Sequence, residues 1–274
     1  MFSITGVIII YLTYCNAHDL PNTQISGGTD AADGRYPYQV SLKHVGRNDH
    51  FCSGTILSKR YVITAANCLE SLHNATDVFV DAGSNNLYSS TRVTYSAEAL
   101  IIHPNYNSTL GINDIGLIRL TKDITFNKII KSINLIPFDQ TFDKELDFIV
   151  TGWGKFSMNG QMSDRLREIH VKEFSQELCH QLYKNITNNH ICSRQAIGKG
   201  ICDGDIGSAL TYDNELIGIA SFNAIPCGNG YPDVFTRVLP YKPWINSYIN
   251  AGSNQRLNIF FVLFVIYLCI YSFL

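Results

Sequence analysis

The segment Tyr38-Gln39-Val40-Ser41-Leu42-Lys43 (YQVSLK) alternates apolar and polar residues at every position. Successive side chains of a β-strand point to opposite faces, so this alternation predicts a half-buried strand. Similar short runs occupy residues 61–64, 77–80, 115–120, 148–150 and 216–220. Turn residues such as Gly27-Gly28 and His103-Pro104-Asn105 separate them. Many short strands with intervening turns predict an all-β barrel or sandwich.

One helix is expected in the body of the chain, at its end. Trp244, Ile245, Tyr248 and Ile249 fall on one helical face, and prolines stand near the start of that segment. We find no short internal repeat and no low-complexity linker, apart from the polar stretch 252–256.

Composition bounds the possible functions. Of the 274 residues, 46% are hydrophobic and 16% charged, which is enough apolar material for a sizeable core and argues against disorder. The net charge is −2 and no run of Lys or Arg stands out, so nucleic acid is not an expected partner. The chain has no CxxC or HExxH pair and no phosphate-binding GxxxxGK[ST] loop, so we expect neither metal nor other cofactor.

Both ends of the chain are apolar. Val7 to Tyr14 form a short hydrophobic run followed by small residues, which predicts a secretory signal peptide over residues 1–17. The alternative is a buried N-terminal strand. Residues 257–274 carry no charge and follow small residues at 250–253 and the spacer at 252–256. This tail predicts membrane association, as a lipid-anchor signal or as a spanning helix, with a hydrophobic extension of no role as the alternative.

Eight cysteines are present, and two of them, Cys15 and Cys269, lie in the terminal apolar segments. The other six predict three disulfides in an exported chain, although spacing alone leaves their pairing open. Sequons at Asn74, Asn107 and Asn185 predict N-glycosylation in the same compartment.

Several motifs appear in one particular order along the chain. They are Ile25-Ser26-Gly27-Gly28, Tyr36 to Leu42, Thr64-Ala65-Ala66-Asn67-Cys68, Asn113 to Leu117, Thr151-Gly152-Trp153-Gly154, Gly204-Asp205-Ile206-Gly207 and Tyr231 to Val238. Together they resemble trypsin- and chymotrypsin-like serine proteases, particularly the insect chymotrypsin type.

The resemblance implies two packed six-stranded antiparallel β-barrels with a cleft between them and a C-terminal helix. It implies a domain over residues 25–251, preceded by a short propeptide at 18–24. It also implies the disulfides Cys52–Cys68, Cys179–Cys192 and Cys202–Cys227.

In that family a serine attacks the peptide carbonyl, a histidine takes its proton and a buried aspartate orients the histidine. Asp114 matches the aspartate, but Asn67 stands in the histidine's place and Ile206 in the serine's place. A carboxamide does not titrate near neutrality, and an alkyl side chain has no lone pair, so the resemblance predicts a pseudo-protease. The alternative is that a nearby hydroxyl, on Ser208 or Ser53, replaces the nucleophile.

Other positions of the cleft depart from the family pattern. The backbone of Gly204 and Ile206 is expected to keep an oxyanion hole, since backbone donors do not depend on the side chain. Gly200 takes the pocket-floor position where a trypsin has aspartate, and Asp233 takes a second floor position. Asp233 either gives the pocket a negative charge or is a turn residue bonded to local backbone.

The segment Ser221-Phe222-Asn223 forms the expected pocket wall, where Asn223 replaces the usual glycine and narrows the mouth. The resemblance also implies activation by cleavage before Ile25, which would bury the new amino group against Asp205. Gln24 precedes Ile25, so a trypsin-like activator is not expected to cut there.

The sequence therefore favours a non-catalytic binding protein, secreted or held at the outer cell surface. It would engage a protein partner, namely a protease, an inhibitor or a protease substrate, as a decoy or regulator of proteolysis. The alternatives are a serine-type endopeptidase with residual or altered activity and a surface adhesion protein.

Overall fold

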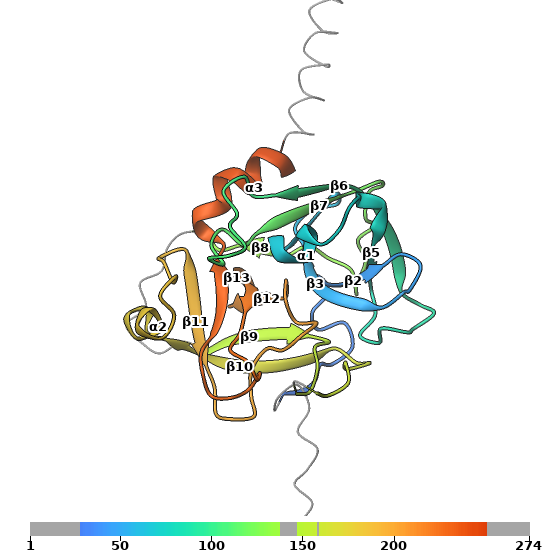
Figure 1. Ribbon diagram of the computed structural model, residues 1–274. Helices are drawn as coiled ribbons and strands as arrows, with labels where there is room; N and C mark the ends of the chain where they lie inside the picture. The colour runs from blue at the N-terminus through green and yellow to red at the C-terminus, as the bar shows by residue number, and fades with distance from the viewer. Residues whose placement is uncertain (1–27, 138–146, 158, 251–274) are drawn as a thin grey trace, which may run out of the picture.

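A computed structural model of the protein describes residues 28–137, 147–157 and 159–250 (Figure 1). The expected signal peptide, propeptide, spacer and apolar tail lie outside the described residues, as does Ile25. The predicted fold class is confirmed, because the strands form two six-stranded antiparallel β-barrels with a helix at the C-terminal end.

The first barrel is closed by six strands in the order β2-β3-β4-β7-β6-β5. Their bounds are Gln39–His44 (β2), His50–Ile56 (β3), Tyr61–Thr64 (β4), Val78–Ala82 (β5), Val93–Ile102 (β6) and Gly116–Leu120 (β7). The strand expected at residues 61–64 coincides with β4. The runs expected at 38–43, 77–80 and 115–120 correspond to β2, β5 and β7 with shifts of one or two residues at the ends, and β3 and β6 were not predicted.

The second barrel runs β9-β10-β11-β14-β13-β12, and pairing of β12 with β9 closes it. Its strands are Asp147–Gly152 (β9), Arg167–Phe174 (β10), His190–Arg194 (β11), Ala209–Tyr212 (β12), Glu215–Phe222 (β13) and Asp233–Arg237 (β14). Two short strands extend the sheet: β1 (Thr29–Asp30) pairs with β10, and β8 (Asn134–Leu135) pairs in parallel with β13.

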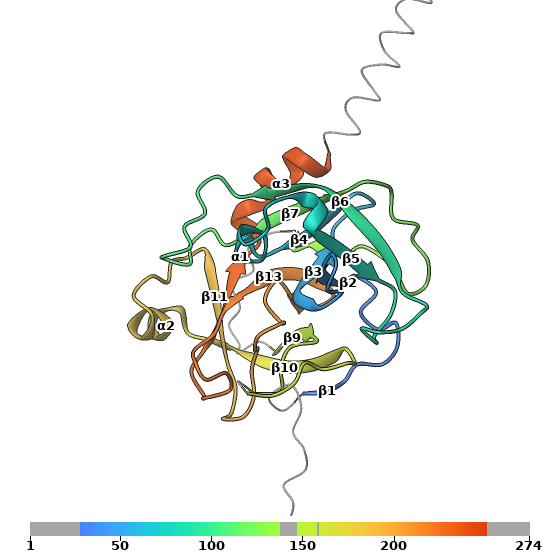
Figure 2. The ribbon, with the colours of Figure 1, turned by 45° about the vertical axis from the view of Figure 1, so that its right-hand side comes forward.

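The predicted C-terminal helix is confirmed as α3, Lys242–Ile249, which lies beside β6 and β7 in both views (Figures 1 and 2). Tyr241 and Ile245 belong to the same hydrophobic cluster as the first-barrel core, so α3 and the turn before it are packed onto the first barrel. Two short helices were not expected from the sequence, α1 (Ala66–Glu70) and α2 (Gln176–Leu182). Each is too short for helical periodicity to stand out.

The expectation of a half-buried strand at residues 38–43 is wrong in one respect. Gln39, Ser41 and Lys43 are as buried as their apolar neighbours. Gln39 exchanges hydrogen bonds with Thr151 of the second barrel, Ser41 meets the His50 ring, and Lys43 pairs with Asp81 at 3.2 Å. The polar face of β2 is therefore covered by the protein, and each buried polar group has a partner.

The three predicted disulfides are confirmed as Cys52–Cys68, Cys179–Cys192 and Cys202–Cys227. Cys52–Cys68 joins β3 to α1, and Cys202–Cys227 joins the two loops that flank β12 and β13. In the part of the chain that the structure describes, no helix has the length and apolar character needed to cross a bilayer.

The Cys52–Cys68 bond provides a test of stability. Changing both residues to alanine should lower the free energy of unfolding by about 3 kcal/mol, because the bond closes a loop of 16 residues in the unfolded chain. Denaturant titration of this variant beside the unmodified protein measures the loss. A change below about 0.5 kcal/mol would show that the bond does not restrict the unfolded chain.

Candidate active site

The site is built around the carboxylate of Asp114, which precedes β7 and is only 2% exposed. Three donors surround it. The Asn67 backbone N–H donates to Oδ1 at 2.8 Å, the Asn67 Nδ2 group donates to Oδ2 at 2.9 Å, and Ser221 Oγ donates to Oδ2 at 2.6 Å. Asn67 comes from α1, and Ser221 from β13 of the other barrel, so the structure brings together residues far apart in the sequence.

The side-chain amide of Asn67 donates two hydrogen bonds through Nδ2. Nδ2 also donates to the Ser221 carbonyl at 3.1 Å, so the carboxamide is held between Asp114 and β13. A carboxamide in this place orients and satisfies the buried acid, but it has no basic nitrogen with which to take a proton.

Burial raises the pKa of Asp114 to about 6, and the hydrogen bonds from Ser221 and from the backbone of Asn67 and Ala66 oppose this shift. The carboxyl is therefore mainly ionised at neutral pH and becomes protonated in mildly acidic solution. The sequence assigned Ser221 only to a pocket wall; its bond to Asp114 depends on how the two barrels pack.

Ile206 lies in the loop between Cys202 and β12, whose backbone is held by contacts with the first barrel. The His50 ring donates from Nε2 to the Gly204 carbonyl at 2.9 Å, and Ser53 N donates to the Ile206 carbonyl at 2.8 Å. Gly204 and Gly207 have φ values of +93° and +85°, a conformation that favours glycine. A Cβ on Gly207 would also overlap the Ser53 carbonyl and the Thr64 hydroxyl.

The side chain of Ile206 is partly buried and packs against both hydrophobic clusters, the one centred on the first barrel and the one of the second barrel. It carries no atom that donates or accepts a hydrogen bond. The position therefore contributes apolar packing, and the oxyanion hole expected at Gly204 and Ile206 stays a prediction.

His50 was not singled out from the sequence, yet it supports this loop. Its Nδ1 lies 2.8 Å from Ser41 Oγ, and burial lowers its pKa to about 4, so the ring is neutral at physiological pH. Both ring nitrogens are already bonded, which leaves His50 no free nitrogen for proton transfer. Its position beside Gly204 was not visible in the sequence.

Asp205 is buried and bound by backbone donors. Gly154 N donates to Oδ1 at 2.8 Å and Cys202 N donates to Oδ2 at 3.0 Å. Burial raises its pKa to about 7. The predicted ion pair with the amino group of Ile25 is not tested, because Ile25 lies outside the described residues.

Gly200 and Asp233 are adjacent, since a Cβ on Gly200 would lie 2.7 Å from Asp233 Oδ2. The Asp233 carboxyl accepts a hydrogen bond from Ile201 N at 2.9 Å, so its partner is a distant segment rather than its own turn. Burial raises its pKa to about 8. At neutral pH this carboxyl is mainly protonated and gives the floor little negative charge.

The expected wall residues behave differently from one another. Phe222 makes edge-to-face contacts with Tyr183 and His190, whereas Asn223 donates from Nδ2 to the neighbouring Ala224 carbonyl at 3.1 Å. Asn223 is therefore tied to its own loop.

A cavity of about 560 Å³ opens beside Asn67, Asp114 and Ser221. Most of its other lining residues come from the loop between β6 and β7 and from the loop after α2, together with the ends of α2 and β13. They are largely apolar or uncharged, with Lys184 as the cation among them. They are Tyr106, Ser108, Thr109, Leu110, Gly111, Leu182, Tyr183, Asn185 and Phe222. We call this space the cleft cavity.

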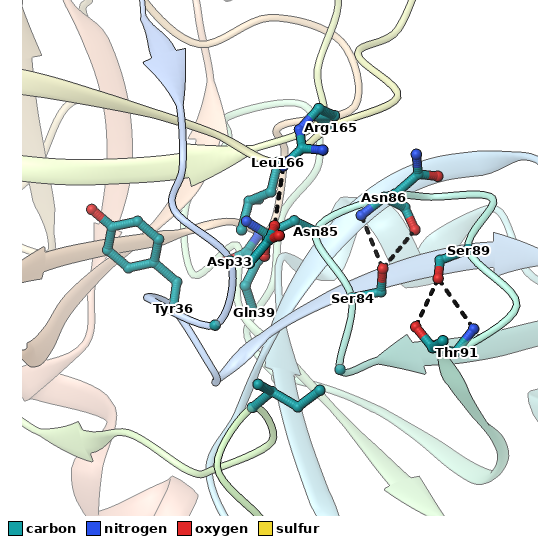
Figure 3. Close-up of a pocket in the computed structure, with 13 residues that line it drawn as sticks. Asp33, Tyr36, Gln39, Ser84, Asn85, Asn86, Ser89, Thr91, Arg165 and Leu166 are labelled. Atoms are coloured by element: carbon teal, nitrogen blue, oxygen red, sulfur yellow. Dashed lines mark hydrogen bonds and ion pairs between the residues drawn. The ribbon is translucent and has the colours of Figure 1, made fainter.

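A second cavity, of about 310 Å³, lies between the loop 83–91 of the first barrel and the segment leading into β10 (Figure 3). Several of its polar groups bond among themselves: Ser84 Oγ with the backbone of Asn86, Ser89 Oγ with Thr91, and Arg165 with Asp33. Gln39 and Asn85, which also line it, bond to groups outside the lining. Among the described residues, no group of three or more His, Cys, Asp or Glu is arranged to hold a metal ion.

Known proteins resemble the chain over most of its length. A family model described as Trypsin matches residues 25–245. Chymotrypsin-2 from Vespa crabro is 43% identical over 81% of this chain and 98% of that protein. Brachyurin from Leptuca pugilator is 34% identical over 81% of this chain and 97% of its own. The structure of human heparin binding protein superposes with a TM-score of 0.74 at 28% identity, covering 82% of this chain and 96% of that chain.

The raised pKa of Asp114 predicts a pH dependence. A carboxyl whose pKa is 3.8 in the unfolded chain and about 6 in the folded protein stabilises the fold below the lower value and loses this contribution as the pH rises to the upper one. The free energy of unfolding of the wild type, minus that of Asp114→Asn, should therefore fall by roughly 1–3 kcal/mol across this window and stay constant above it. Denaturant titrations at each pH measure the difference. An increase across the same window would mean that the hydrogen bonds outweigh burial.

Proposed function

Because this chain belongs to the trypsin family of serine proteases, we propose that it is a non-catalytic member that acts by binding a protein partner. The main support for this proposal is the identity of the two side chains, Asn67 and Ile206, at the positions that match the family's reaction centre. Asn67 occupies the bonding position beside Asp114, and Ile206 occupies the turn held by His50 and Ser53.

The proposal rests first on the missing base. Acyl transfer requires a group that takes a proton from the nucleophile and returns it to the leaving amine. Asn67 donates two hydrogens through Nδ2 and has no nitrogen lone pair that is basic near neutrality. Asp114 does not replace it, because its oxygens already accept from Asn67 and Ser221.

The missing nucleophile is the second support. Ile206 has neither a lone pair nor an ionisable group, so no acyl-enzyme forms on it. The two hydroxyls considered as substitutes, those of Ser53 and Ser208, belong to residues with no exposed surface. Ser53 Oγ donates to the Gly204 carbonyl and Ser208 Oγ accepts from Gln39, so both are engaged in holding the loop.

A binding role is supported by the surface that remains. Both barrels and the three disulfides are intact, so the domain keeps a folded surface on which a protein partner can dock. Trypsin-family domains meet protein substrates and inhibitors, so a protease, an inhibitor or a protease substrate is the proposed class of partner. One structural relative is named for the heparin that it binds. We do not extend heparin binding to this chain, whose net charge is −2.

The proposal includes export from the cell. Three disulfides fit an oxidising compartment, in line with the signal peptide proposed at residues 1–17. The mature domain would span residues 25–251. It would be held at the outer surface either by a lipid that replaces the apolar tail at 257–274 or by that tail as a spanning helix. Release of the protein from cells by a phospholipase that cleaves glycosylphosphatidylinositol would identify the tail as a lipid-anchor signal.

The rival function is a serine endopeptidase with residual or altered activity. Backbone donors and substrate binding alone retain about 10³–10⁴-fold acceleration over water when a triad is removed. Such a rate falls far below that of an intact protease, in which loss of the nucleophile or base costs about 10⁶-fold in turnover.

Restoring the two side chains tests the proposal. The wild type should show no turnover of a peptide library and no labelling by a fluorophosphonate. The double variant Asn67→His, Ile206→Ser, cut before Ile25, should hydrolyse peptides at a readily measured rate, about 10⁶-fold above that of the wild type. The single variant Asn67→His is the matched control, because it has the base without the nucleophile. Stoichiometric labelling of the wild-type protein would contradict the proposal.

A further inference from the structure

Two of the three sequons lie on the rim of the cleft cavity. Ser108 and Thr109, of the Asn107 sequon, line it from the loop between β6 and β7, and Asn185 lines it from the loop between α2 and β11. The first loop belongs to the first barrel and the second loop to the second barrel. The third sequon residue, Asn74, does not line this cavity.

One histidine holds the two loops together. The backbone N–H of Thr187, in the Asn185 sequon, donates to His190 Nδ1 at 3.0 Å. The hydrogen of the neutral ring therefore lies on Nε2, which donates to the Gly111 carbonyl of the other loop at 3.1 Å. Because His190 is only 1% exposed, this link is shielded from water and keeps the two sequons on facing sides of the cavity.

Both asparagines are available for modification. Asn107 and Asn185 are exposed. Asn107 Oδ1 accepts a hydrogen bond from Leu110 N at 3.0 Å, which leaves its Nδ2 unused, and the Asn185 side chain has no hydrogen-bond partner among the described residues. The disulfides place the chain in the oxidising secretory compartment, where sequons are modified.

We propose that Asn107 and Asn185 each carry an N-linked oligosaccharide and that the two sugars together close the cleft cavity to folded proteins. Each Nδ2 attacks the anomeric carbon of a lipid-diphosphate-linked oligosaccharide. The new C–N bond forms as the C–O bond to phosphate breaks; the lipid diphosphate leaves with the electron pair, and the proton from Nδ2 passes to a base of the transferase. No oxidation or reduction occurs.

The two sugars would limit the surfaces on which a protein partner can bind. Bulky, hydrated sugars on facing loops leave the cavity open to water and small molecules but not to the reactive loop of an inhibitor or to a neighbouring protease domain. The consequence for the partner rests on the proposed function: the partner docks on a face away from Asn107 and Asn185.

The first test is occupancy. The full-length chain, secreted from a eukaryotic host, is digested and its peptides are analysed by mass spectrometry before and after enzymatic removal of N-glycans. We expect sugar on Asn107 and on Asn185. Unmodified asparagine as the main species at either residue would overturn the proposal.

The second test measures access to the cavity through Lys184, the lysine among its lining residues. The protein is acylated with N-hydroxysuccinimide acetate or with the same ester on a large poly(ethylene glycol), and modification of Lys184 is read by mass spectrometry. Removing the Asn107 sugar is the decisive comparison, because Asn107 lies on the opposite loop from Lys184. In Asn107→Gln and in Asn107→Gln, Asn185→Gln, the ratio of large to small reagent should rise by roughly tenfold.

Asn74→Gln is the matched control and should leave the ratio at the wild-type value, since Asn74 does not line the cavity. Enzymatic removal of the sugars from the folded wild type repeats the measurement without any substitution that affects folding. An unchanged ratio after sugar removal would overturn the proposal. Both tests use the isolated protein and measure only its sugars. Failure of the proposed function would appear instead as hydrolysis of a peptide substrate, so the two failures are distinguishable.

Discussion

The structure of the site depends on one constraint: the buried carboxylate of Asp114 must be surrounded by donors. A charge at this depth is tolerated only when hydrogen bonds replace its water. Ser221 and Asn67 supply those bonds from two different barrels, so satisfying the acid also fastens the barrels together. Asparagine meets this structural demand as a donor, whereas the chemical demand for a proton acceptor is not met. The scaffold and the chemistry of the site are therefore separable.

The loop that carries Ile206 shows the same separation. The loop's main chain is held by hydrogen bonds to the His50 ring and to the backbone of Ser53 and Ala220, and its glycines have positive φ. None of these features involves the side chain at position 206. An isoleucine therefore fits without a hydroxyl and gains apolar contact with both hydrophobic clusters. The fold of this loop therefore does not depend on a hydroxyl at position 206. The proposed sugars would likewise leave the fold unchanged, since Asn107 and Asn185 are exposed and lie on loops.

The sequence predicted much of this molecule correctly. Short apolar runs identified four strands of the first barrel, β2, β4, β5 and β7, and two of the second, β9 and β13. The resemblance implied the three disulfide pairs, which are confirmed. The roles assigned to Asp114, Asn67 and Ile206 stay predictions from the resemblance; the structure places Asn67 beside Asp114. Two expectations differ from the structure because of contacts between distant segments. The polar face of β2, expected at the surface, is covered by the rest of the protein. Of the two alternatives for Asp233, the bond to its own turn is wrong, because the carboxyl accepts from Ile201 N.

By itself, then, the sequence determined which atoms are available: the alternation that makes strands, the cysteines that pair, and the carboxamide and alkyl groups that replace a base and a nucleophile. Side-chain chemistry is a property of each residue, so folding does not alter that inventory. Only the tertiary structure decided which groups meet. It placed Ser221 on Asp114, used both nitrogens of His50 to hold the Gly204 loop, and set Asn107 and Asn185 on facing loops through His190. These juxtapositions arise from the packing of two closed barrels, in which residues distant along the chain become neighbours.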